Sequence, residues 1–250
     1  MKPISVQLYS LREACKTDFP GVLKRLAEIG YVGVEPAGFH GMTAGEFKQR
    51  VEDLGLVVSS THSPWASPDN VQEVVDTLGI LDTCFVAGGK GPNDFVDLDA
   101  IKRTAEVFET TRAALAPHGI TLTVHNHAWE YEMLEGRMKI DWLLEFAPEL
   151  QFELDTYWAA NFGANSPAEQ VRRFADRCPL LHIKDGPLEK DAPMVAVGSG
   201  RMNMKEVIAA ANETTKWLVV ELDRSATDMM TCVADSYAYL TSEGLARGNL

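Results

Sequence analysis

The chain has 250 residues, of which 46% are hydrophobic and 24% are charged. This composition excludes a disordered or fibrous protein, and the length suits one closed α/β barrel with a full core. The formal net charge of −13 would repel a phosphate backbone, so we expect no nucleic-acid partner.

The sequence carries no signal for export or membrane insertion. Its amino-terminal stretch MKPISVQLYSLRE lacks the basic and long apolar segments of a secretory signal, and no apolar run approaches the roughly 20 residues that cross a bilayer. We therefore expect a cytoplasmic protein without a membrane partner. The cysteines form no CxxC pair, which favours free thiols over a zinc finger or redox motif at Cys15, Cys84, Cys178 and Cys232.

Short β-branched runs alternate along the chain with stretches whose apolar residues recur every three or four positions. The former predict strands and the latter predict helices. In chain order the predicted elements are strand Ile4–Tyr9, helix Phe19–Ile29, strand Val32–Glu35, helix Ala44–Leu54, strand Leu56–His62, helix Val71–Leu78, strand Thr83–Ala87, helix Leu98–Ala116, strand Ile120–His125, helix Ile140–Phe146, strand Gln151–Asp155, helix Ala168–Arg177, strand Leu180–Lys184, helix Met204–Ala211, strand Leu218–Leu222 and helix Met229–Leu240.

Eight β-then-α units predict a (β/α)8 TIM barrel that forms a single domain over residues 1–250. Strands rich in Val, Ile and Leu suit a parallel sheet that is covered on both faces. Glycines directly after predicted helices, at Gly30, Gly55 and Gly119, are typical of left-handed helix caps before the next strand. An open, doubly wound sheet is the alternative, because periodicity alone does not distinguish it from a closed barrel.

Carboxylates and imidazoles recur at the carboxyl ends of the predicted strands, which in a TIM barrel surround one cavity. Alternate residues of a strand share a face, so paired positions should point into the barrel together. The residues concerned are Glu35, His62, His125 with His127, Glu153 with Asp155, His182 with Lys184, and Glu221 with Asp223, while Glu130 follows strand five.

Carboxylates crowded into one cavity repel each other unless a cation compensates them. We therefore predict one divalent metal ion, bound by Glu130, Asp155, His182 and Glu221. An oxygen-rich set with one imidazole suits Mn²⁺ or Mg²⁺, with Co²⁺ or Zn²⁺ as further options. The alternative is a set of ordinary salt-bridged residues at the rim.

Several segments with these residues resemble the xylose isomerase-like TIM barrels, the sugar phosphate isomerase/epimerase group that also contains endonuclease IV and inosose dehydratase. The resemblance covers nearly the whole chain and lies in Val6–Arg12, Gly33–Glu35, His125–Tyr131, Leu154–Trp158, Leu181–Asp185 and Gly198–Gly200.

The resemblance implies a metal held by two Glu, one Asp and one His, which map onto the four ligands named above. Many members carry the strand-five Glu at the strand terminus, where this chain has His125 or His127. Glu130, Glu132 and these imidazoles are therefore alternative ligands, and an imidazole would favour a softer metal.

The predicted function is a metal-dependent sugar or sugar phosphate isomerase or epimerase that abstracts a proton next to a carbonyl through an enediolate. Glu130 and Glu221 would transfer protons. Lys184 would stabilise an oxyanion or act as a base, unless it only pairs with Asp155 or Asp185. The predicted substrate-binding residues are Glu35, His62, His125, His127 and Trp158, with Trp65 and Trp129 as further stacking surfaces.

Other functions stay open. A lyase or dehydratase acting on a keto-sugar or keto-glycoside uses the same proton abstraction, and a non-catalytic sugar-binding barrel would need only the cavity. An endonuclease would need more metal ligands and a basic face, against which the charge argues. The glycine-rich segment Ala87–Gly91 lacks P-loop spacing and is predicted as a mobile loop near the site. A homo-oligomer is neither predicted nor excluded.

Overall fold

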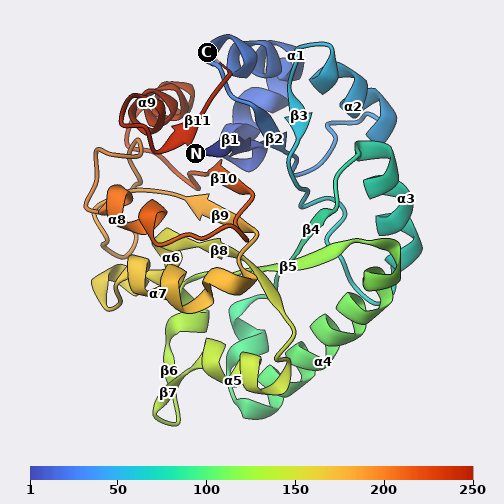
Figure 1. Ribbon diagram of the computed structural model, residues 1–250, viewed down its shortest axis with the longest axis vertical. Helices are drawn as coiled ribbons and strands as arrows, with labels where there is room; N and C mark the ends of the chain where they lie inside the picture. Colours follow the sequence, from blue (N-terminus) through green and yellow to red (C-terminus); the bar gives the residue numbers. More distant parts are fainter. Residues whose placement is uncertain (250) are drawn as a thin grey trace.

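The computed structural model describes residues 1–249. Its barrel strands are β1 (Lys2–Gln7), β2 (Gly33–Glu35), β3 (Val57–Val58), β4 (Phe85–Gly88), β5 (Thr121–His125), β8 (Gln151–Asp155), β9 (Leu180–Ile183) and β10 (Trp217–Val220). The helices are α1 (Arg12–Ile29), α2 (Ala44–Glu52), α3 (Val71–Leu81), α4 (Leu98–Leu115), α5 (Lys139–Phe146), α6 (Thr156–Ala159), α7 (Pro167–Phe174), α8 (Met204–Ala209) and α9 (Met229–Ser242). Figure 1 shows the helices arranged around the outside of the strands.

The strands pair in parallel in the order β3-β2-β1-β10-β9-β8-β5-β4. The two ends of this path meet through Thr61, which forms a parallel bridge with Val86. The backbone N–H of Thr61 donates to the carbonyl of Phe85 at 3.1 Å, and that of Ala87 donates to Thr61 at 2.9 Å. The sheet is therefore closed, which confirms the predicted TIM barrel and excludes the open sheet.

The predicted elements are all present, although several of their ends differ. Strand three is the largest difference, because regular pairing covers only Val57–Val58 instead of Leu56–His62. The chain changes partner there: the N–H of Ser59 still donates to Val34 on β2, whereas Thr61 already pairs with β4. The chain pairs with β2 and then with β4 over too few residues each to form a longer regular ladder.

Some short elements were not predicted. A hairpin of β6 (Met133–Leu134) and β7 (Arg137–Met138) projects beside α5 (Figure 1). β11 (Ala246–Arg247) pairs with β1 and so brings the C-terminal segment beside the first strand. Strands of two residues carry too little periodicity to be recognised in a sequence. Among residues 1–249, no helix has the length and apolar character that a membrane span requires.

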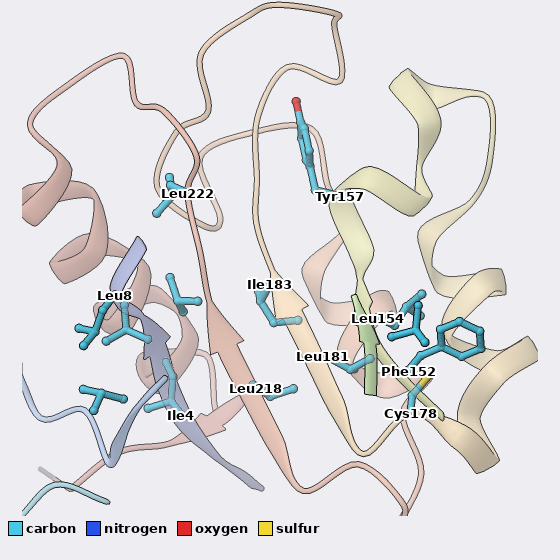
Figure 2. Close-up of a cluster of buried hydrophobic side chains, with 14 of the residues drawn as sticks. Ile4, Leu8, Phe152, Leu154, Tyr157, Cys178, Leu181, Ile183, Leu218 and Leu222 are labelled. Carbon is cyan, nitrogen blue, oxygen red and sulfur yellow. The ribbon is translucent and has the colours of Figure 1, made fainter. Parts of the chain in front are cut away.

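The two faces of the barrel strands differ in chemistry. Apolar side chains such as Leu154, Ile183 and Leu218 form a buried layer, part of which is drawn in Figure 2. The alternate positions carry polar groups, among them Glu153 and His182, which are also fully buried. Because buried polar groups cost free energy unless they are paired, this polar interior has to be held together by its own contacts.

Candidate active site

A cavity of about 390 Å³ lies at the carboxyl ends of the barrel strands. This volume is within the range of small-molecule sites, roughly 300–1,000 Å³. The cavity combines flat aromatic surfaces with titratable groups, and its lining includes Tyr9, His62, Trp65, His125, His127 and Glu221.

Lys184 forms the centre of the polar groups near this cavity. Its Nζ lies 2.8 Å from Asp155 Oδ2, 2.7 Å from Glu221 Oε2 and 3.1 Å from Asp223 Oδ2. Burial opposes its charge, but these three carboxylates outweigh burial and hold the pKa of Lys184 well above its ordinary value. Lys184 is thus a permanent cation, and it pairs with Asp155 rather than with its neighbour Asp185.

Asp185 instead organises the loop that follows β9. Its carboxylate accepts hydrogen bonds from the backbone N–H groups of four loop residues, Gly186, Gly198, Gly200 and Met202. The Gly198–Gly200 segment is therefore a structural part of the rim.

Asp155 is fixed by its surroundings on both sides. The side chain of Asn126 bonds the backbone N–H of Asp155 at 2.9 Å and its carbonyl at 3.1 Å. The Oδ1 atom accepts from the backbone N–H of Trp158 and so caps α6. The Oδ2 atom is left within ion-pair distance of Lys184 but without hydrogen-bond geometry. Burial, only partly offset by Lys184, raises the pKa of Asp155 to about 6.

His182 lies between two groups of carboxylates. Its Nδ1 is 2.7 Å from Glu221 Oε2, and its Nε2 is 2.9 Å from Glu35 Oε1 and 3.1 Å from Glu153 Oε1. Burial alone would lower the pKa of His182, but the three carboxylates raise it well above its ordinary value. Glu221 is the converse case: burial opposes ionisation, yet Lys184 and His182 hold its pKa well below the usual range.

A deeper group lies behind His182. Glu35 accepts from Gln7 Nε2 at 2.6 Å and from the hydroxyl of Ser60. The Nε2 atom of His62 is 2.5 Å from Glu153 Oε2. Burial disfavours the charge on Glu35, but His62 and His182 outweigh it and hold the pKa of Glu35 well below its ordinary value. The same pairing, against burial, raises the pKa of His62 to about 10.

His125 and His127 are neutral imidazoles at the cavity wall. Burial, followed by repulsion from His182, lowers the pKa of His125 well below its ordinary value. Burial and the ammonium of Lys184 lower the pKa of His127 to about 4. The Nδ1 atoms of both rings are buried and have no hydrogen-bond partner within residues 1–249. Each ring can therefore offer a free nitrogen lone pair.

The donor set fits a divalent cation. His125, Asp155, His182 and Glu221 each offer a ligand atom, and these atoms lie within 4.8 Å of one another. The carboxylates of the cluster outnumber the side chains that carry positive charge, because Glu35, Glu153, Asp155, Glu221 and Asp223 face Lys184, His62 and His182. A cation would supply the missing charge and give Oδ2 of Asp155 a ligand bond in addition to its ion pair with Lys184. A second, overlapping group with the same spacing consists of His62, His125, Glu153 and His182.

The structure brings three of the four predicted ligands together, namely Asp155, His182 and Glu221. Glu130 is buried but belongs to neither group of ligand atoms. It lies in a 3-10 helix, residues 128–131, where its Oε2 accepts from the backbone N–H of His127 at 2.9 Å. Burial raises the pKa of Glu130 to about 8. The role of Glu130 as a ligand stays a prediction, whereas the carboxylate of Glu132 is engaged with Lys139 at 2.6 Å.

Some of the predicted substrate-binding residues line the cavity and others do not. His62, His125 and His127 are in the cavity wall. Glu35 is 0% exposed and lies behind His182, and Trp158 packs against Tyr157 and Phe162 with its ring 5.7 Å from Lys184 Nζ. Both lie outside the lining, since Glu35 is buried against His182 and Trp158 belongs to α6.

Sequence reasoning did not select several residues that the structure brings to the site. Glu153 shares a strand face with Asp155, and this alternation would have been a reason to select it as a site residue. Gln7 ends β1 and bonds Glu35, and Asp223 follows β10 and pairs with Lys184. Tyr9 follows β1 in a 3-10 helix, Leu8–Leu11, and only the fold places its ring at the cavity.

The glycine-rich segment after β4 makes room for Trp65. A side chain on Gly89 would put its Cβ 2.7 Å from Cζ3 of Trp65. The indole therefore lies directly against this backbone, with its ring 4.9 Å from the ring of His62. The segment thus supports the ring of Trp65, which lines the cavity.

The sequence matches the model of the xylose isomerase-like TIM barrel family over residues 23–242. The chain belongs to this family. The resemblance seen in the sequence is thereby confirmed. A comparison of this xylose isomerase-like barrel with curated proteins finds no match.

Solved structures share the fold along nearly the full chain. A sugar phosphate isomerase/epimerase from Parabacteroides distasonis is 25% identical with a TM-score of 0.82, and the match covers 98% of this chain and 96% of that one. The probable 3-DHS dehydratase AsbF, involved in petrobactin synthesis in Bacillus anthracis, is 15% identical with a TM-score of 0.69 over 96% and 98% of the chains. An AP endonuclease of family 2 from Brucella melitensis is 17% identical, with a TM-score of 0.70 over 97% and 99%. The latter two similarities show the fold alone.

Proposed function

We propose that this xylose isomerase-like barrel is a divalent-metal-dependent enzyme that isomerises or epimerises a sugar or sugar phosphate. The observation that carries the proposal is the convergence of Asp155, His182 and Glu221 beside a cavity with aromatic and imidazole walls. The similarity to the sugar phosphate isomerase/epimerase of Parabacteroides distasonis supports the reaction class.

Asp155, His182 and Glu221 are the proposed metal ligands, with either His125 or Glu130 as the fourth. When bound, a divalent cation would polarise a substrate carbonyl and stabilise the enediolate left by proton loss. Glu130 as fourth ligand would favour Mn²⁺ or Mg²⁺, whereas His125 would shift the preference towards Co²⁺ or Zn²⁺.

The side chains of the cavity suggest distinct roles in proton transfer. Glu221 reaches the cavity as a carboxylate and is proposed as the base that takes the proton from carbon. Lys184 keeps its proton, so we propose it as a hydrogen-bond donor to a developing oxyanion and not as a base. Glu130 remains the proposed second acid or base, and neutral His127 can accept a hydrogen bond from a substrate hydroxyl.

Hydrogen exchange in D2O tests this function. Protein loaded with Mn²⁺ is incubated with a panel of ketoses and keto-glycosides, and solvent deuterium at carbon is measured by NMR. We expect exchange with at least one substrate, and a loss of about 100-fold or more in Glu221→Gln. Glu145→Gln is a matched control, because Glu145 lies on α5 outside the barrel and pairs with Arg137 of β7.

The products separate the neighbouring functions. Formation of a double bond or release of an aglycone would identify a dehydratase or lyase that starts from the same proton abstraction. Binding of metal without exchange on any member of the panel would contradict an isomerase and favour a sugar-binding barrel.

A further inference from the structure

His182 offers one nitrogen to each of the two overlapping ligand groups. Its Nδ1 faces Glu221, which borders the cavity, and its Nε2 faces Glu35 and Glu153, which are fully buried. One neutral imidazole can coordinate a cation through one nitrogen while the other nitrogen keeps its proton. The two groups therefore cannot both use His182 as a neutral ligand at the same time.

The group of His125, Asp155, His182 and Glu221 is the better site for a cation, because it contains two carboxylates, whereas the group of His62, His125, Glu153 and His182 contains one. Glu221 and His125 both line the cavity, so a cation bound there can meet a substrate. Oδ2 of Asp155 makes no hydrogen bond within residues 1–249, and the other oxygen and the backbone of this residue are already fixed. Oε1 of Glu153 also makes none, but the carboxylate of Glu153 is already paired with His62 at 2.5 Å. A cation in this group takes the Nδ1 atom of His182, since that is the nitrogen on the side of Glu221.

The buried carboxylates Glu35 and Glu153 lie beside the other nitrogen, Nε2 of His182. Glu35 is anchored by Gln7 from β1 and by Ser60 after β3, so its Oε1 is fixed 2.9 Å from Nε2 of His182. Glu153 lies on the adjacent strand β8 and places Oε1 at 3.1 Å from the same nitrogen. Glu35 thus accepts the Nε2–H of His182, and Glu153 adds a second buried carboxylate within ion-pair distance of the same nitrogen.

We propose that Glu35, which accepts the Nε2–H of His182, and Glu153, whose charge lies beside it, are positioning residues that keep the proton on Nε2, so that the Nδ1 lone pair faces Asp155 and Glu221 as a metal ligand. Glu35 then acts through His182 and does not bind substrate. The inference rests on the proposed metal-dependent function. Carboxylates behind a ligating histidine fix its tautomer and ring orientation, and their loss typically lowers metal affinity by about 10–100-fold.

Metal affinity is the primary test. Binding of Mn²⁺ and of Co²⁺ is measured by calorimetry for the wild type, Glu35→Gln, Glu153→Gln and the surface control Glu145→Gln. We expect both interior variants to bind about 10–100-fold more weakly and the control to bind as the wild type does. Gln7→Leu removes an anchor of Glu35 without changing a carboxylate and should weaken binding in the same direction, which covers the case that Glu35→Gln does not fold.

A spectroscopic measurement separates positioning from a merely structural role. In the Co²⁺ protein, the N–H proton of a coordinated histidine gives a shifted, solvent-exchangeable NMR signal. We expect this signal to exchange slowly in the wild type, because the proton is held by buried carboxylates, and to exchange faster in Glu35→Gln.

The outcomes separate the two proposals. If the wild type binds no divalent cation, the proposed function and this inference both fail. If it binds one but Glu35→Gln, Glu153→Gln and Gln7→Leu bind equally well, only the inference is overturned. Two cations per chain would also overturn it, since the deeper group would then be a metal site itself.

Discussion

Buried charged side chains in this barrel are stabilised by contacts with side chains of opposite charge. Lys184 is the clearest case, because three carboxylates lie within 3.1 Å of its ammonium group and no part of it reaches solvent. A cation and an anion buried together can balance their lost hydration, whereas either one alone cannot. The contribution of Lys184 to the free energy of unfolding therefore depends on whether another cation is present.

Replacement of Lys184 tests this dependence. In EDTA we expect Lys184→Met to lower the free energy of unfolding by about 3–5 kcal/mol, because Asp155 and Glu221 lose their buried partner. Added Mn²⁺ should recover part of the loss. Urea unfolding monitored by circular dichroism measures both effects, with exposed Lys16→Met as a control that leaves the midpoint unchanged. Equal midpoints for Lys184→Met and the wild type in EDTA would contradict this account.

At the scale of elements, the rim loop after β9 is held close to Asp185. Asp185 gathers four backbone N–H groups, and the loop must come close enough to reach its carboxylate. At Gly200 an added Cβ would lie 2.1 Å from Oδ1 of Asp185 and 2.5 Å from the backbone nitrogen of Gly186. Backbone atoms cannot give way as a flexible side chain can.

A pair of glycine substitutions tests this constraint. Gly200→Ala should destabilise the protein by about 1–3 kcal/mol through overpacking. Gly79→Ala is the matched control: nothing lies within 4 Å of the added Cβ in the last turn of α3, so this change should stabilise by about 0.5–1 kcal/mol. Thermal unfolding of both variants gives the comparison. A Gly200→Ala protein as stable as the wild type would mean that the loop can shift away from Asp185.

On the scale of the whole molecule, closure of the barrel brings together side chains from strands far apart in the chain. Glu35 and His182 are 147 residues apart and lie within 2.9 Å. A cation bound at this junction would link β8, β9 and β10, which exist in this arrangement only in the folded state. Ligands that bind the folded state alone raise the free energy of unfolding.

Metal-linked stability should follow the ionisation of Asp155. At a free Mn²⁺ concentration 100 times its dissociation constant, we expect a gain of about 2.7 kcal/mol at pH 8. Because the pKa of Asp155 is raised to about 6, a proton competes with the cation below that pH, and the gain should disappear as pH falls.

Without metal, the pH dependence of the stability contributed by Asp155 has the opposite sign. A raised carboxyl pKa favours the folded state only while the group is protonated, so this contribution is lost as pH rises from the ordinary pKa of 3.8 towards 6. Thermal unfolding from pH 5 to 8, with Mn²⁺ or EDTA, measures both dependences. A gain from Mn²⁺ that does not change with pH would exclude Asp155 as a ligand.

The sequence by itself determined the barrel class, the order of its elements and the end of the strands at which polar groups gather. Local patterns suffice for these features, because alternation along a strand decides which residues share a face. Asp155, His182 and Glu221 were found in this way, and Glu153 was within reach of the same rule.

Only the tertiary structure decided which of these atoms meet. Glu130 bonds the turn that contains it, Trp158 packs in α6, and Glu35 lies behind His182. Such positions depend on where the chain leaves each strand and on partners more than a hundred residues away. Distances of 3 Å across a closed barrel follow from the packing of all its strands at once, and no single segment encodes them.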